Sequence, residues 1–323
     1  MAVNDNNKRV FYASQAVGVG PATGVATTVT GAQSVTMNTN FNLEQVFQLG
    51  QLAVYDNVVG DPSVEVSITK ALDGQRTMYN LGTGGGGSLV ATSSTESQVV
   101  FVVGDDTKER IGENNDTSAL SQDTAQITCN PIYLQSLNYN FAVDGDFTEE
   151  ATFVGLSKAI GTGLGVGTPA SGFTDRQTVL RRQNFNQSTS TVPVAVSGQN
   201  IQSISISADF GRESMYKLGR FKEFHRYVNF PLEITCDIEV IAKSLDTQAI
   251  DVPDVSCSGL NLPKENITLN FCNSTGLPTY TFTLSQATLT SVAFGGGDTG
   301  GGNATLTFSY IIYNSFTPAD GLY

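Results

Sequence analysis

The sequence of 323 residues predicts an all-β protein made of two tandem copies of one domain, with one short helix in each copy. Three observations predict this fold class. Apolar and polar residues alternate with period two in several runs, which is typical of half-buried strands. These runs are rich in Thr, Val, Ile, Tyr and Phe, which favour a pleated surface. Finally, a segment of the first half recurs in the second half.

The recurring segment defines the two copies. Residues 33–62 align with residues 202–231 without a gap, and 8 of the 30 aligned positions are identical. Average composition would give about 2 identities by chance. We therefore predict an internal duplication, with a first domain over 8–160 and a second over 177–316. The stretch 161–176 begins with many Gly, Thr, Ser and Pro residues and is the expected linker.

Strands are expected where the alternation is clearest: Gln33–Asn40, Val64–Lys70, Gln202–Ala208, Thr279–Leu284 and Ala304–Tyr310. Each half also ends in an expected hairpin, the first with a Gly/Asp turn and the second with a Gly-rich turn. The hairpin strands are 137–143 with 150–154, and 289–294 with 303–310.

The expected helices are short and lie in matching connections. Leu43–Leu49 is followed by Gly50, and Arg212–Leu218 is followed by Gly219, so a glycine could act as the C-terminal cap of each. A connection of roughly 20 residues in a compact β domain is usually functional or a contact element. The tail Asn314–Tyr323 is expected to be loosely held.

The composition excludes several classes of function. The chain has 30 acidic and 17 basic residues, a net charge of −13, which argues against a surface that binds nucleic acid. We expect no membrane segment, because the apolar runs are far too short, and no secretory signal at the start of the sequence. The four cysteines are expected to be free thiols in a reducing cytoplasm, with a Cys257–Cys272 disulfide as the alternative.

We expect no enzyme, no cofactor and no metal site. His225 is the only histidine, so a triad or a multi-histidine metal site has little to be built from, and a structural or interfacial role is expected. The glycine runs 82–87 and 295–302 lack the Lys-Ser/Thr of a phosphate-binding loop. One hairpin turn is acidic and contains Asp144, Asp146, Glu149 and Glu150. We interpret it as a solvated tip or as a charged pore lining, because a calcium-binding loop would need a longer pattern of oxygen ligands.

The charge is unevenly placed. Residues 1–170 carry 17 acidic and 7 basic side chains, a net −10, whereas residues 171–323 carry 13 and 10, a net −3. The matching connections have opposite signs: the first is acidic, with Glu44, Asp56 and Asp61, and the second is basic, with Arg212, Lys217, Arg220, Lys222 and Arg226. The contrast reflects either drift on two solvated loops or a complementary contact between subunits that sets the register of an assembly.

These patterns resemble a known family. The hairpins Tyr139–Gly155 and Ala287–Ser309 are similar to the C-terminal hairpin of bacteriophage tail tube proteins, and the strand, long loop and strand at 33–70 and 202–241 resemble the stacking-loop region of that family. The opening Arg9–Val17 resembles the start of phage structural proteins.

The resemblance implies a β-sandwich or barrel in each domain. It implies that six domains close a ring, that rings stack through the long loops, and that the lumen carries the tape-measure protein and later the viral DNA. Family lumens tend to be negative, which would assign a lumen-lining role to the acidic hairpin turn of residues 144–150. Sheath, baseplate and neck proteins are further implied partners. The implied location is the virion, after assembly in the cytoplasm of the host bacterium.

The doubled chain leaves the ring stoichiometry open. Three chains could close a pseudo-six-fold ring, which we favour because both copies keep the same pattern, or six chains could each contribute one copy to the inner barrel. Two other classes of function remain as alternatives. One is a baseplate ring or capsid decoration protein, and the other is a carbohydrate-binding or adhesin-type protein. The absence of Trp and an aromatic content of 9% weaken the second.

Overall fold

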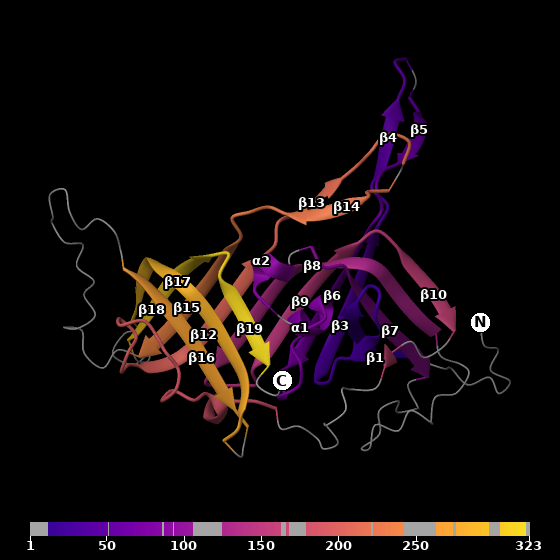
Figure 1. The fold of residues 1–323 in the computed structure, drawn as a ribbon. Helices are drawn as coiled ribbons and strands as arrows, with labels where there is room; N and C mark the ends of the chain where they lie inside the picture. Colours follow the sequence, from indigo (N-terminus) through magenta and orange to yellow (C-terminus); the bar gives the residue numbers. More distant parts are fainter. Residues whose placement is uncertain are drawn as a thin grey trace.

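The computed structural model describes residues 12–50, 52–85, 87–92, 94–105, 125–162, 166–167, 179–220, 222–241, 263–273, 276–296 and 304–320. It confirms the all-β class. Within these ranges, mostly antiparallel strands form one large sheet, two short α-helices lie against it, and residues Arg182–Asn184 form a 3₁₀ helix (Figure 1). The α-helices are α1 (Met78–Thr83) and α2 (Leu89–Thr92).

The strands of the first half are β1 (Tyr12–Pro21), β2 (Ala26–Thr28), β3 (Ala32–Asn40), β4 (Leu43–Phe47), β5 (Val54–Val59), β6 (Ser63–Ala71), β7 (Ser97–Asp105), β8 (Ala125–Ala142), β9 (Thr148–Gly155), β10 (Lys158–Thr162) and β11 (Val166–Gly167). Those of the second half are β12 (Asn200–Asp209), β13 (Arg212–Met215), β14 (His225–Val228), β15 (Glu233–Ile241), β16 (Lys264–Cys272), β17 (Pro278–Gly295), β18 (Thr305–Tyr313) and β19 (Phe316–Asp320).

The large sheet runs through both halves of the chain. In the first half β3, β6, β9 and β8 are neighbours in that order, and in the second half β12, β15, β18 and β17 are neighbours in that order. Strand β8 also pairs with β12, so this junction makes the two halves one sheet. The hairpins β4–β5 and β13–β14 form two separate two-stranded sheets outside it.

Burial follows the alternation that predicts the strands. Val64, Val66 and Ile68 of β6 are buried while the residues between them are less so, and β15 repeats the pattern. One buried cluster contains residues of both halves. Its aromatic centre crosses between them, because the ring of Phe141 lies 4.6 Å from that of Phe271.

The five predicted strands and the pairing of both terminal hairpins are confirmed, with most strands longer than expected and β18 shifted to begin at Thr305. Both predicted helices are wrong: the segments 43–49 and 212–218 contain β4 and β13. The helices α1 and α2 both lie in the first half, at sites that were not predicted. The tail is also not loose over its described part, because β19 pairs with β17 and Phe316 is fully buried.

Other expectations lie partly or wholly outside the described residues. Cys257 lies outside them, as does the tip of the second terminal hairpin at 297–303. Of the expected linker, only residues 161–162 in β10 and 166–167 in β11 are described. Cys129, Cys236 and Cys272 carry free thiols, and burial raises the pKa of Cys236 to about 12.

Candidate functional site

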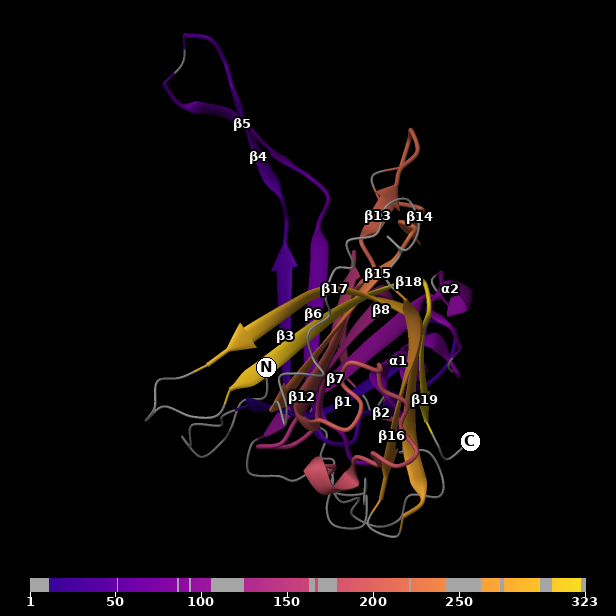
Figure 2. The ribbon, with the colours of Figure 1, turned by 90° about the vertical axis from the view of Figure 1, so that its left-hand side faces the viewer.

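The first candidate feature is the hairpin β4–β5. Its strands pair from Leu43 opposite Val59 to Phe47 opposite Val54, and every residue of both strands is exposed. Figures 1 and 2 show that this hairpin stands away from the large sheet. Large apolar side chains are exposed along the whole hairpin, and those of Leu49 and Leu52 at its tip are fully exposed. The exposed apolar residues are Phe41, Leu43, Val46, Phe47, Leu49, Leu52, Val54, Tyr55, Val58 and Val59. Isolated two-stranded hairpins are marginally stable in water, so this one needs a covering surface.

The hairpin β13–β14 occupies the matching position in the second half but is held against the body. Arg212 makes this contact, since its Nε donates to the backbone oxygen of Leu134 at 2.6 Å. The guanidinium also lies 5.3 Å from the ring centre of Tyr133 and 5.5 Å from that of Phe210. Burial lowers the pKa of Arg212 to about 10, and the guanidinium stays charged at neutral pH. Arg212 therefore serves as an anchor within the chain.

A second arginine of this hairpin is also used internally. Arg226 donates through Nε to Glu223 at 2.6 Å, and both side chains are buried. Arg212 and Arg226 therefore both have partners within the chain, and their contact with another subunit stays a prediction. The remaining predicted cations, Lys217, Arg220 and Lys222, are exposed around the tip.

The two hairpins meet within one chain. Burial raises the pKa of Tyr216, in the β13–β14 hairpin, and a hydrogen bond to Asp61 raises it further. Asp61 follows β5 and is partly exposed, and the side-chain amide of Asn42 donates to its backbone oxygen at 2.6 Å. Glu44 and Asp56 are exposed on the β4–β5 hairpin. Figure 1 shows the β13–β14 hairpin reaching toward the base of β4–β5.

The acidic turn between β8 and β9 divides into two environments. Asp144 and Glu150 are exposed, and Asp146 accepts from Nε of Arg181 at 2.6 Å. Glu149 is fully buried, so its expected place on a lumen surface is wrong. The reason is the period of the strand: Glu149 shares the inner face of β9 with Ala151 and Phe153.

Glu149 instead holds helix α1. Its carboxylate accepts from the backbone nitrogen of Met78 at 2.9 Å and from the hydroxyl of Tyr139 at 2.8 Å. Burial raises the pKa of Glu149 to about 7, against the opposing effects of Lys70 and of these hydrogen bonds. Sequence reasoning missed this site, although Thr77 before the helix and Gly84 after it are ordinary capping residues.

A second, partly buried carboxylate, from β19, joins the same cluster. Asp320 of β19 accepts from the backbone nitrogen of Thr77 at 3.3 Å, and burial raises its pKa. Lys70, also fully buried, donates to the backbone oxygen of Arg76 at 2.7 Å and lies 3.5 Å from Asp73. The hydroxyl of Tyr280 donates to the backbone oxygen of Gln75. These contacts tie the second half to the segment before α1.

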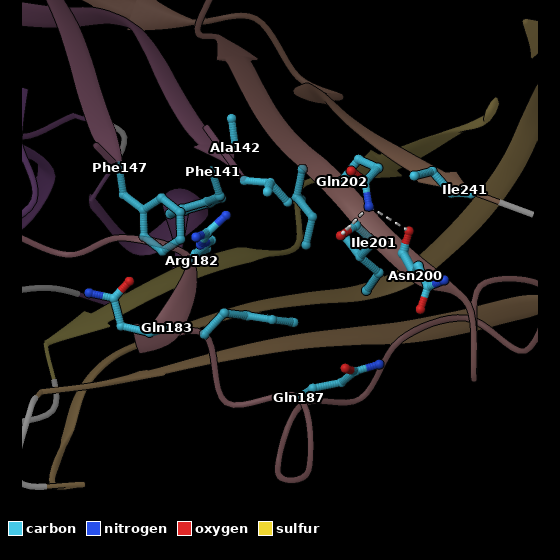
Figure 3. Close-up of a pocket in the computed structure, with 13 residues that line it drawn as sticks. Phe141, Ala142, Phe147, Arg182, Gln183, Gln187, Asn200, Ile201, Gln202 and Ile241 are labelled. Atoms are coloured by element: carbon cyan, nitrogen blue, oxygen red, sulfur yellow. Dashed lines mark hydrogen bonds between the residues drawn. The ribbon is translucent and has the colours of Figure 1, made fainter. Parts of the chain in front are cut away.

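An open cavity of about 600 Å³ lies where β8, β12 and the segment after the linker meet (Figure 3). Phe141, Phe147 and Ile204 give it apolar walls, while Arg182 and Gln202 supply polar groups. The Gln202 amide donates within its own strand, to the backbone oxygen of Asn200 at 3.3 Å. The cavity holds no arrangement of nucleophile, base and acid among its lining residues.

The residues that the structure describes contain no group of three or more His, Cys, Asp or Glu side chains placed to hold a metal ion. They also contain no helix long and apolar enough to cross a membrane. His225 is the first residue of β14, where it is partly exposed.

No protein-family model matches the chain, and no curated protein matches it significantly.

Proposed function

We propose that the chain is a structural protein that assembles with copies of itself into stacked rings, forming the hollow tail tube of a bacteriophage. The observation that carries the proposal is the projecting β4–β5 hairpin. Its apolar side chains are exposed on both faces, and those at its tip touch nothing in the chain's own body. A surface of this kind is typical of a contact with another protein molecule.

The energetics favour such a contact. Burying one Leu, Val or Phe side chain is worth roughly 1.5–3 kcal/mol. Covering half of the exposed apolar side chains of this hairpin would therefore contribute on the order of 10 kcal/mol, before the entropy lost on association is subtracted. That is enough to hold one ring on the next when several hairpins act together.

The family resemblance supplies the remaining parts of the proposal. The lumen would hold the tape-measure protein and then the viral DNA, and exposed carboxylates such as Asp144 and Glu150 are candidates for a repulsive lining. Sheath, baseplate and neck proteins would contact the assembled tube. The protein would reside in the virion, with no catalytic role. We favour a ring of three chains with two units each, and the alternative is a ring of six chains.

Negative-stain electron microscopy of the purified protein tests the proposal. The wild-type chain should form long hollow tubes. The double variant Leu49→Asp with Leu52→Asp should form single rings or free chains, because it places charges at the tip of the hairpin. The matched control is Val194→Asp, an exposed apolar residue on the body, which should leave the tubes intact.

Four outcomes would count against the tube. A wild-type chain that stays monomeric at high concentration would refute self-assembly. Closed single rings that never stack would favour a baseplate ring, and specific binding to a purified capsid would favour a decoration protein. Specific affinity in a glycan screen would revive the carbohydrate-binding alternative.

A further inference from the structure

The large sheet contains the same four-strand unit twice. The order β3, β6, β9, β8 in the first half matches β12, β15, β18, β17 in the second, and all pairs are antiparallel. The irregularities match as well. The β3–β6 register shifts between Ala32 and Ser34, and the β12–β15 register shifts between Ile201 and Ser203, 169 residues later. Whether the repeat arose by duplication stays a prediction, but the geometry of the two units is equivalent.

A second matching irregularity aligns the last strands of the two units. The β8–β9 register shifts between Leu134 and Ser136, and the β17–β18 register shifts between Leu289 and Ser291. Bulges are fixed features of a strand pair, so they define equivalent positions. Residues of β17 therefore correspond to residues of β8 that lie 155 positions earlier.

The structure shows how the end of one unit joins the start of the next. Strand β8 pairs with β12 from Ser136 opposite Asp209 to Ala142 opposite Ser203. On the inner face of this junction, Tyr139 lies opposite Ile206 and Leu137 lies opposite Ala208, and all four side chains are buried.

The outer edges of the two units lack this pairing. Among the described strands, β3 pairs with β6 alone, and residues 289–295 of β17 pair with β18 alone. The side chains of β17 on this edge are exposed because no described strand pairs with it on that side. Val292 and Phe294 correspond to the buried Leu137 and Tyr139, but they are 40% and 62% exposed. In Figure 1, β17 lies on the left of the sheet, whereas β3 lies to its right, beside β6.

We infer that β17 of one copy pairs with β3 of the next copy in the register that β8 and β12 already use within the chain. This inference rests on the proposed function and names its lateral contact. The correspondence places Val292 opposite Thr39, Ala293 opposite Asn38, and Phe294 opposite Met37 of the neighbouring copy. The side chain of Phe294 would then be buried against that of Met37, which is partly exposed in the single chain.

The pairing also accounts for two long edges that would otherwise be exposed. An unpaired edge strand presents a row of free backbone groups and invites uncontrolled association. Strand β3 spans nine residues without a proline or lysine to block such pairing. A defined partner strand, set in register by side chains on one face, removes this hazard.

Cysteine crosslinking tests the register. Asn38→Cys with Ala293→Cys places two thiols directly opposite each other across the inferred seam, on exposed positions. Mild oxidation of the assembled protein should give a ladder of covalent oligomers on a non-reducing gel. The geometric control is Asn138→Cys with Ser207→Cys, the equivalent pair within one chain, which should form an intramolecular bond and no ladder.

A register control and the wild-type chain complete the experiment. Asn38→Cys with Ser291→Cys moves one thiol by two residues on the same face, and it should lose the ladder. The inference is overturned if tubes form but the directly opposed pair gives no ladder while the intramolecular control oxidises, or if the shifted pair crosslinks equally well. A wild-type chain that does not assemble at all contradicts the proposed function as well, so the two failures are distinguishable by microscopy.

Discussion

The buried carboxyl group of Glu149 should make the stability of the chain depend on pH. Its pKa is about 7 in the folded chain, compared with an ordinary value of 4.5. The folded state therefore binds the proton more tightly than the unfolded state does. The resulting stabilisation is fully present below about pH 4.5 and is lost as the pH rises through about 7.

The size of the effect follows from the difference in proton affinity. Each tenfold difference is worth about 1.4 kcal/mol, so the free energy of unfolding should fall by about 2 to 3 kcal/mol between about pH 5 and pH 8 from this group alone. Asp320 lies in the same cluster and burial raises its pKa as well, so a variant is needed to isolate the contribution of Glu149.

The variant Glu149→Gln removes the titration while keeping the shape of the side chain. Urea unfolding followed by circular dichroism at several pH values would give the free energy of unfolding of each form. The double variant Leu49→Asp with Leu52→Asp serves as background, so that assembly does not interfere. Relative to that of Glu149→Gln, the free energy of unfolding of the parent should fall by about 2 to 3 kcal/mol as the pH rises from about 5 to about 8.

The neighbouring residue provides the control. Glu150→Gln removes an exposed carboxylate from the same strand and controls for the loss of one negative charge there. Parallel curves for Glu149→Gln and the parent would refute the reasoning, because they would mean that the carboxyl group titrates alike in the folded and unfolded states.

Three further predictions concern other parts of the chain. Arg212→Met should release the β13–β14 hairpin from the body, because the lost hydrogen bond to Leu134 lowers the stability of this contact by about 1–3 kcal/mol. Trypsin should then cleave at Lys217 or Arg220 faster than in the control Lys222→Met. Lys217→Glu with Arg220→Glu should weaken assembly with a reduced dependence on salt, measured by sedimentation; unchanged assembly would argue that these charges are merely solvated. Phe316→Ala should cost about 3–5 kcal/mol in urea unfolding, because the ring is fully buried, whereas a loosely held tail would show almost no change.

The large sheet was predictable because burial on one face imposes period two on the sequence. The same rule would have placed Glu149 on the buried face with Ala151 and Phe153, but its neighbours in an acidic turn drew the interpretation toward solvent. Arg226 is a similar case, since it shares its face of β14 with the buried Val228. The alternation of buried and exposed positions along a strand therefore predicts the burial of these charged residues better than local composition does.

The predicted helices failed for a different physical reason. Leu43, Val46 and Phe47 have the spacing of an apolar helix face, but the segment does not pack on the chain's own core, so its pattern is not shaped by that core. Its content of Val, Phe and Tyr fits a strand better. Helix α1 escaped prediction because it has only six residues and depends on Glu149, which comes from 71 positions away.

The junction between β8 and β12 has a consequence for how an assembly would nucleate. Because the two units are parts of one chain, their mutual contact forms during folding, at a local concentration that dilution cannot change. Only the contact between β17 and the β3 strand of another copy would depend on protein concentration. A closed ring would then need half as many encounters between molecules as one made from separate units. The two units of each chain could also acquire different charges without ever being shuffled into the wrong order.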